Sequence, residues 1–238
     1  MMIKAMTSLA IAALAFTATS ADAQVRAKLF SRDSLAAAVT PYAAEARHGG
    51  WQIGPIARGR NYSLGMPLYA RDFGHGGFTF DFPYASARAG HVHYVTRPVR
   101  TLAGASIIRV RYQVEASPGT RFIPQEDSHR PATVSLYFQR AGDNWSGRGR
   151  FAAYRWYAPP AEVRQIKPGQ FEMRVRLDDP AWVGVTGGIT AGNNPTAYRA
   201  ALRHAGRIGL VFGSAGLRGH GVFATAPARF TVTDFSIR

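Results

Sequence analysis

Flat aromatic rings and guanidinium groups occur together at residues 154–157, which read Tyr-Arg-Trp-Tyr. Aromatic faces can carry a stacked sugar ring, and a guanidinium group can hold a carboxylate through two parallel hydrogen bonds. Successive side chains of a strand point to opposite faces, so Trp156 would share a face with Tyr154, and Tyr157 with Arg155. We expect Trp156 to point inward and Tyr157 outward, and the opposite assignment stays open. The candidate ligand-binding residues of this region are Trp145, Arg155, Tyr157 and Trp182.

Two rows of arginine have the spacing of a strand. Arg109 and Arg111 would share one strand face, and Arg174 and Arg176 would share another. Each row should point away from the core, and the rows form one cationic surface if their strands lie in the same sheet. The chain has 29 Lys and Arg against 14 Asp and Glu, a formal net charge of +15, and 26 of the 29 bases are arginine. This balance favours acidic partners over strongly basic ones.

Metal and cofactor chemistry has few candidate residues. His91 and His93 would lie on one side of a strand, where two imidazoles can bind a transition metal. No third ligand is identifiable. We therefore predict surface or interface histidines rather than a metal site. The Asp-Asn pair at 143–144 and the Asp-Asp pair at 178–179 could hold a structural calcium, although turn chemistry accounts for both equally well. The chain has no cysteine, which excludes disulfides, thiol nucleophiles and Cys-ligated metals, and we expect no cofactor.

Strands are the elements that must position these residues. From residue 50 onward, apolar side chains recur at every second position, most clearly in Ile108, Val110 and Val114. In the last predicted strand the apolar positions change parity, which predicts a β-bulge near Thr233-Asp234. At least eight strands are expected, at 78–82, 91–99, 108–115, 134–139, 151–158, 170–178, 207–212 and 228–237.

These strands predict an all-β fold in one domain over residues 51–238. Half-buried strands with loops of varied length favour a two-sheet antiparallel β-sandwich of jelly-roll type, and a closed barrel is the alternative. One short helix, Thr196–His204, is expected between Asn194-Pro195 as its start and Gly206 as its end. The helix side chains expected to face the core are Tyr198 and Leu202.

The first part of the chain has the pattern of an export signal. Residues 1–23 contain a basic residue, an apolar stretch over 6–16 and a small-x-small sequence at 21–23. We place the mature start at Gln24, because the apolar run is shorter than a transmembrane anchor needs. Residues 24–50 are Ala-rich and are expected to form a short helical lead-in. The mature protein would then be periplasmic or secreted.

Two resemblances add to this interpretation. The expected architecture, with aromatic loops and a final strand Phe230-Thr-Val-Thr-Asp-Phe-Ser-Ile237, resembles carbohydrate-binding modules and concanavalin-like jelly-roll domains that act on glycans. Tyr137-Phe-Gln-Arg-Ala-Gly142 is similar to the Tyr-Phe-Lys-Ala-Gly strand of jelly-roll alginate lyases. The other two lyase motifs have only degenerate counterparts, in the segments 108–111 and 91–93. This resemblance implies catalytic candidates for proton transfer and carboxylate neutralisation, namely Tyr137, His93, Arg111 and Gln139.

The sequence therefore favours an exported protein that binds an acidic polysaccharide or another anionic envelope glycan. It would use a basic sheet face and aromatic loops, with Arg109, Arg111, Tyr137, Gln139, Arg174 and Arg176 among its contacts. A polysaccharide lyase acting on a uronate polymer is the first alternative. An envelope-associated structural or interaction protein is the second. Nucleic acid would suit the charge but conflicts with export.

Overall fold

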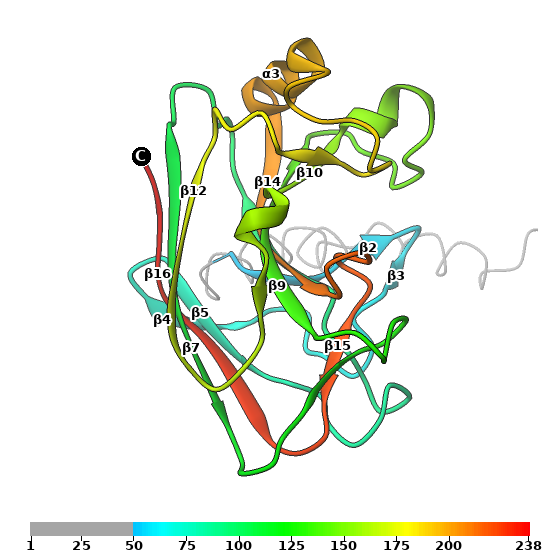
Figure 1. The fold of residues 1–238 in the computed structure, drawn as a ribbon, viewed down its shortest axis with the longest axis vertical. Helices are drawn as coiled ribbons and strands as arrows, with labels where there is room; N and C mark the ends of the chain where they lie inside the picture. Colours follow the sequence, from blue (N-terminus) through cyan, green and yellow to red (C-terminus); the bar gives the residue numbers. More distant parts are fainter. Residues whose placement is uncertain (1–49) are drawn as a thin grey trace, which may run out of the picture. The chain divides into compact units, whose positions relative to one another are not determined.

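Two antiparallel sheets make up most of the structure, a computed structural model that describes residues 50–238. One sheet has the strand order β1 (Gln52–Gly54), β6 (Tyr94–Pro98), β14 (Ala205–Gly213), β9 (Thr133–Arg140), β10 (Arg155–Tyr157) and β13 (Val183–Gly184). Its seventh strand, β11 (Arg164–Gln165), pairs with β9. The other sheet has the order β12 (Gly169–Arg176), β7 (Ile107–Ala116), β16 (Ala228–Ile237), β5 (Gly77–Asp81) and β4 (Arg71–Gly74). Figure 1 shows β7, β12 and β16 in one layer and β9, β10 and β14 in the other.

Short elements lie in the connections between the strands of the two sheets. Two small ribbons pair β2 (Ile56–Ala57) with β3 (Arg60–Asn61), and β8 (Phe122–Pro124) with β15 (Val222–Ala224). The helical elements are α3 (Pro195–Arg203) and the 3-10 turns η1 (Gly149–Ala153) and η2 (Pro160–Glu162). The predicted signal peptide at 1–23 lies outside the described residues, and so does the lead-in at 24–50 except for its last residue.

The main core lies between the two sheets. Along β7 the residues Ile108, Val110 and Val114 are buried, while the arginines between them point the other way. Phe212 from the seven-stranded sheet packs edge-on against Phe230 of the five-stranded sheet, with ring centroids 5.2 Å apart. Burying aromatic rings of this size is the main favourable term in such a core. The fold is therefore all-β and sandwich-like.

Several predicted elements agree with the structure. The last strand has the predicted bounds, and its pairing with β7 shifts between Val232 and Asp234, which confirms the bulge. The helix is also confirmed: Asn194 precedes it and Tyr198 is buried. The predicted strand at 151–158 is wrong in its first half. Residues 149–153 form the turn η1, which follows Gly147 and begins at Gly149, both at positive φ.

Candidate functional site

The outward face of the seven-stranded sheet carries a second aromatic cluster, separate from the main core. Tyr94, Tyr137 and Tyr157 pack there with Val211. The ring of Tyr137 lies 5.2 Å from that of Tyr157 and 5.0 Å from that of Tyr94. The hydroxyls of Tyr94 and Tyr157 share a hydrogen bond of 2.9 Å. All three tyrosines are buried, so they form a floor on this face.

A buried ion pair lies beside these tyrosines. Arg155 Nε is 3.0 Å from Asp143 Oδ2, with 9% of the arginine side chain and none of the aspartate side chain exposed. This Nε lacks hydrogen-bond geometry toward the carboxylate, whereas Gln139 Nε2 donates to the same Oδ2 at 2.9 Å. Two charges can be buried at tolerable cost only when they are paired. The pair therefore ties the loop after β9 to strands β9 and β10.

The ion pair also fixes Trp145. The backbone of Trp145 has φ 65°, the left-handed region that side chains other than glycine rarely adopt. Its N–H donates to Asp143 Oδ1 at 3.2 Å, and its carbonyl accepts from Arg155 Nη2 at 3.1 Å. The indole lies 5.1 Å from the Arg155 guanidinium carbon and 5.5 Å from the ring of Tyr94. Such a conformation costs on the order of 1 kcal/mol, and it persists because these contacts over-determine it.

Half-buried Trp145 forms part of the wall of a pocket of about 380 Å³, which we call the Trp145 pocket. The pocket opens on the outward face of the seven-stranded sheet, between the end of β9 and the start of β14. Its lining includes Tyr94, Thr96, Gln139, Arg140, Asp143 and Arg207. It thus combines an aromatic wall with an amide and two arginines.

Two arginines supply the cationic groups of the Trp145 pocket. Arg207 is held on β14 because its Nε donates to Thr96 Oγ1 at 2.9 Å and its Nη2 to the Thr96 carbonyl at 3.0 Å. Arg140 is half-buried, with its guanidinium carbon 4.6 Å from the centre of the Tyr154 ring. The negative charge of the lining, Asp143, is already matched by Arg155 beneath it. Arg140 is therefore the cationic group that can attract an anionic ligand into this partly enclosed space.

The structure brings several of the predicted site residues to this place. Pairing of β9 with β10 sets Tyr157 opposite Tyr137 and Arg155 opposite Gln139. Trp156 points into the main core, as expected from the alternation. Tyr137, Tyr157 and Arg155 are nevertheless buried, with exposed fractions of 0%, 7% and 7%. They support the pocket from below, while Gln139 and Trp145 line it.

Trp182 is not at this site, which corrects its expected role in binding a sugar. It is fully buried in the main core, where it packs against Phe138 and Tyr198. Its indole N–H donates to the Arg176 carbonyl at 2.8 Å. The loop at 178–182 turns back over the sandwich, so an aromatic ring that looks loop-borne in sequence fills space between elements.

The predicted arginine rows lie side by side on the outward face of the five-stranded sheet. Pairing of β12 with β7 places Arg174 opposite Arg109 and Glu172 opposite Arg111. Each row points away from the core, as predicted. Glu172 Oε2 is 3.0 Å from both Arg109 Nη2 and Arg111 Nε, so one carboxylate lies within the arginine cluster.

The rest of this face is also paired. Asp178 forms an ion pair with Arg176, and Asp81 lies within 3.0 Å of both Arg71 and Arg229. The hydrogen bond from Arg229, together with Arg71, lowers the pKa of Asp81. Acidic partners therefore offset part of the positive charge of this face, on which the arginines in these ion pairs outnumber the carboxylates.

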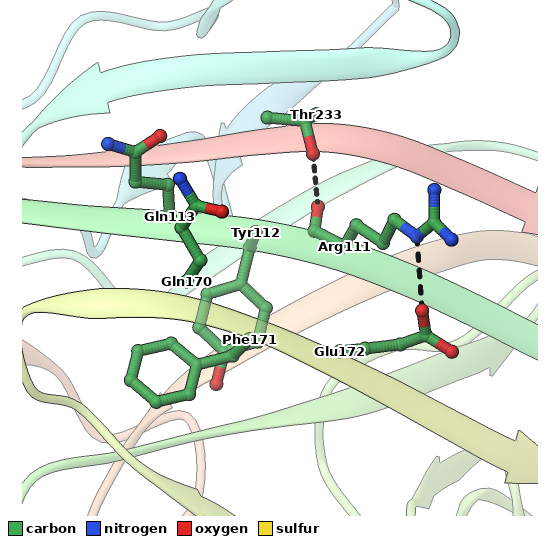
Figure 2. A pocket seen from close by; sticks show the side chains of 7 residues that line it. All are labelled: Arg111, Tyr112, Gln113, Gln170, Phe171, Glu172 and Thr233. Atoms are coloured by element: carbon green, nitrogen blue, oxygen red, sulfur yellow. Dashed lines mark hydrogen bonds and ion pairs between the residues drawn. The ribbon is translucent and has the colours of Figure 1, made fainter.

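A hollow of about 390 Å³ lies on this face, and Figure 2 shows its lining side chains. Arg111 reaches toward Glu172, and the amides of Gln113 and Gln170 lie near each other. The hydroxyl of Thr233, at the bulge of β16, donates to the Arg111 carbonyl at 3.3 Å. Glu172 engages Arg111 within this hollow, so an anionic ligand there would compete with that carboxylate.

The candidates for lyase chemistry do not converge. Arg111 and Tyr137 lie on the outward faces of different sheets, with the main core between them. Tyr137 is fully buried, its hydroxyl has no partner, and burial raises its pKa well above the usual value. Burial lowers the pKa of His93 to about 4. Elimination needs a proton acceptor that reaches the sugar carbon, and Tyr137 lacks that access.

The acidic pairs proposed for calcium are engaged in other contacts. Asp143 binds Arg155 and Gln139, Asp178 binds Arg176, and Asp179 Oδ1 accepts the Ala181 N–H at 2.8 Å. Within residues 50–238, no three His, Cys, Asp or Glu side chains are grouped so that they could hold one metal ion.

Sequence reasoning missed most of the lining of the Trp145 pocket, including Tyr94, Thr96, Arg140 and Arg207. Tyr94 and Thr96 alternate along β6 and share its outward face, a signal that could have found them. Arg140 and Arg207 lie far apart in sequence, and the pairing of β9 with β14 brings them into one pocket. No local sequence pattern predicts the pairing of β9 with β14.

Comparison with protein-family models and with curated protein sequences finds no match for this chain. No helix within residues 50–238 is long and apolar enough to cross a membrane.

Proposed function

We propose that this is an exported carbohydrate-binding protein that recognises an acidic polysaccharide in the Trp145 pocket. One observation carries the proposal: a buried ion pair holds a half-buried tryptophan at positive φ in the wall of an arginine-rich pocket. Strained backbone held in this way is concentrated at ligand-binding positions. The indole would stack on a sugar ring, and Arg140 would pair with its carboxylate.

Export and topology belong to the same proposal. The pattern at 1–23 supports cleavage before Gln24 and a periplasmic or secreted protein. The two-sheet arrangement supports a jelly-roll topology like that of carbohydrate-binding modules. An exported protein would meet anionic envelope glycans rather than nucleic acid.

Binding to polyuronates tests the site. We expect the protein to be retained on alginate or polygalacturonate and to pass through neutral glucans. Trp145→Ala and Arg140→Ala should each weaken binding about tenfold, equivalent to about 1.4 kcal/mol. Titration calorimetry with a defined oligogalacturonate would measure the dissociation constants.

Matched variants elsewhere on the surface provide the controls. Tyr84→Ala removes an exposed aromatic ring, and Arg199→Ala removes an exposed arginine of α3; neither residue lines the Trp145 pocket. Both should bind as the wild type does. Arg111→Ala tests the other sheet, and a larger loss from Arg111→Ala than from Arg140→Ala would move the site to the hollow of Figure 2.

A polysaccharide lyase is the alternative that the same samples can reveal. The wild type would be incubated with uronate polymers while the absorbance of unsaturated sugar ends is followed. We expect no rise, because Tyr137 is buried and Arg111 lies on the other sheet. A steady rise that Tyr137→Phe abolishes while binding persists would establish a lyase instead.

An envelope-associated interaction protein is the second alternative, and one observation favours it. Exposed large apolar side chains are concentrated in one stretch of the described chain: Ile56, Tyr62, Leu64, Leu68, Phe73 and Tyr84. A double variant, Leu64→Ser and Leu68→Ser, tests this role. If it stops co-purifying with envelope fractions while glycan binding is unchanged, the protein has an envelope-associated role that does not depend on glycan binding.

A further inference from the structure

His91 and His93 form a pair of buried imidazoles just before β6. Their ring centroids are 4.7 Å apart, and both residues have an exposed fraction of 7%. His91 Nδ1 lies 3.1 Å from the Ala87 carbonyl, and His93 Nδ1 lies 2.8 Å from the Gly219 carbonyl. Because a carbonyl oxygen can only accept, each Nδ1 carries a proton and each neutral ring presents an Nε2 lone pair.

A third lone pair comes from Gln125. Its Oε1 and the Nε2 of His93 are both buried and have no hydrogen-bond partner. A Cβ atom added to Gly221 would lie 2.9 Å from this Oε1 and 2.8 Å from this Nε2. The two acceptors therefore lie over the same glycine. Two buried acceptors without a donor are unfavourable, which points to a species that accepts their electron pairs.

A further histidine lies next to these two acceptors. His220 Nδ1 lies 2.8 Å from Glu126 Oε2, in an exposed contact beside Gly221. A metal ligand must present a nitrogen without a proton, and His93 presents Nε2 because its Nδ1–H is directed at the Gly219 carbonyl.

We propose that His91 Nε2, His93 Nε2 and Gln125 Oε1 bind a divalent transition-metal ion of the zinc, nickel and copper group. Imidazole nitrogen suits these metals, and metal-ligating histidines almost always donate their other N–H to a carbonyl or carboxylate. With Zn–N bonds near 2.0 Å, two imidazole centroids lie about 5 Å apart, close to the 4.7 Å here.

Two histidines alone are too few ligands for a metal site, so the amide oxygen of Gln125 is needed. No group of three His, Cys, Asp or Glu side chains within residues 50–238 could hold a metal. Gln125 supplies the third ligand, and water would complete the coordination. The site is separate from the Trp145 pocket and does not depend on the proposed function.

Metal binding is tested on the full chain, purified without a histidine tag and stripped with a chelator. We expect one Zn²⁺ or Co²⁺ per protein in equilibrium dialysis followed by elemental analysis. His91→Ala and His93→Ala should weaken Co²⁺ binding at least tenfold. His129→Ala removes an exposed histidine elsewhere and should change nothing.

Gln125 variants separate a metal site from a simpler arrangement. If the Gln125 amide is turned so that its N–H donates to His93, both atoms are satisfied without an ion. A metal site predicts that Gln125→Glu tightens Co²⁺ binding severalfold and Gln125→Leu weakens it. The opposite effects of these two Gln125 variants on Co²⁺ binding can be measured even if His93→Ala fails to fold. Equal binding by both Gln125 variants, equal loss in His129→Ala, or no stoichiometric binding by the wild type would overturn the proposal.

Discussion

At the scale of single residues, the buried ion pair of Asp143 and Arg155 is the clearest constraint on the fold. Both side chains are almost fully buried, so solvent screens their charges little and each depends on the other. Asp143→Asn keeps the shape but leaves Arg155 as an uncompensated buried charge. We expect a loss of about 3 kcal/mol in the free energy of unfolding, measured by urea denaturation.

The exposed pair of Asp178 and Arg176 provides the matched control. Both side chains are more than 60% exposed, so solvent screens their attraction. Asp178→Asn should change the free energy of unfolding by less than about 1 kcal/mol. A similar loss in both variants would show that burial of the Asp143 pair has no special role.

His93 makes a pH-dependent contribution at the same scale. Its pKa is about 4 in the folded protein and near 6.5 in an unfolded chain. Between these values the unfolded chain takes up a proton that the folded chain does not. The stabilisation is thus complete above about pH 6.5 and is lost as the pH falls toward 4, by up to about 3 kcal/mol.

His93→Gln removes this titration. The free energy of unfolding of wild type and variant, measured in urea at several pH values from 7 to 4.5, should converge as the pH falls. Acid expansion of a chain with net charge +15 affects both proteins, so only the difference between them reports on His93. Parallel curves would contradict the assignment.

At the scale of elements, β14 shows how one glycine shapes the sheet beneath the site. Gly209 lies opposite Thr96 on one side and Tyr137 on the other. A Cβ on Gly209 would clash with the backbone of β6: it would lie 2.7 Å from the Thr96 Cα and closer still to the Val95 carbonyl oxygen. Glycine within a strand often marks such a close backbone approach.

Gly209→Ala should therefore force β6 and β14 apart. We expect a loss of more than about 2 kcal/mol in the free energy of unfolding, because the displaced atoms are backbone rather than flexible side chain. Gly188→Ala is the control: no atom lies within 4 Å of its Cβ position. An unchanged melting temperature for Gly209→Ala would show that the strands can separate without cost.

For the whole molecule, the distribution of charge matters more than its sum. The net charge is +15, yet the five-stranded sheet places Glu172 among its arginines. Glu172→Gln would remove the carboxylate that Arg109 and Arg111 share and make this face of the sheet more cationic. We expect later elution from a sulfated matrix, with the difference shrinking as salt screens the exposed charges.

Gln113→Glu on the same sheet face adds a negative charge and should shift elution the other way. Unchanged elution of Glu172→Gln at low salt would mean that the matrix contacts a different face, such as that of the Trp145 pocket.

The strands, the bulge of β16 and the helix α3 could be predicted from sequence, because each depends on local signals. Alternation marks β7, the change of parity marks the bulge, and Asn194-Pro195 mark the helix start. Outward projection of the arginine rows also follows from alternation alone. The turn η1 was not predicted, because an alternating stretch after two glycines has the sequence pattern of a strand.

Tertiary structure alone decided which residues meet. Trp182 and Trp145 are both loop aromatics in sequence, yet one is core and the other half-buried at a pocket, since their surroundings come from distant strands. The order β6-β14-β9 joins Thr96, Arg207 and Arg140, and the sandwich separates Tyr137 from Arg111. Periodicity sets the face of a strand on which a side chain lies; the pairing of strands distant in sequence, which buries the most apolar surface, sets its neighbours.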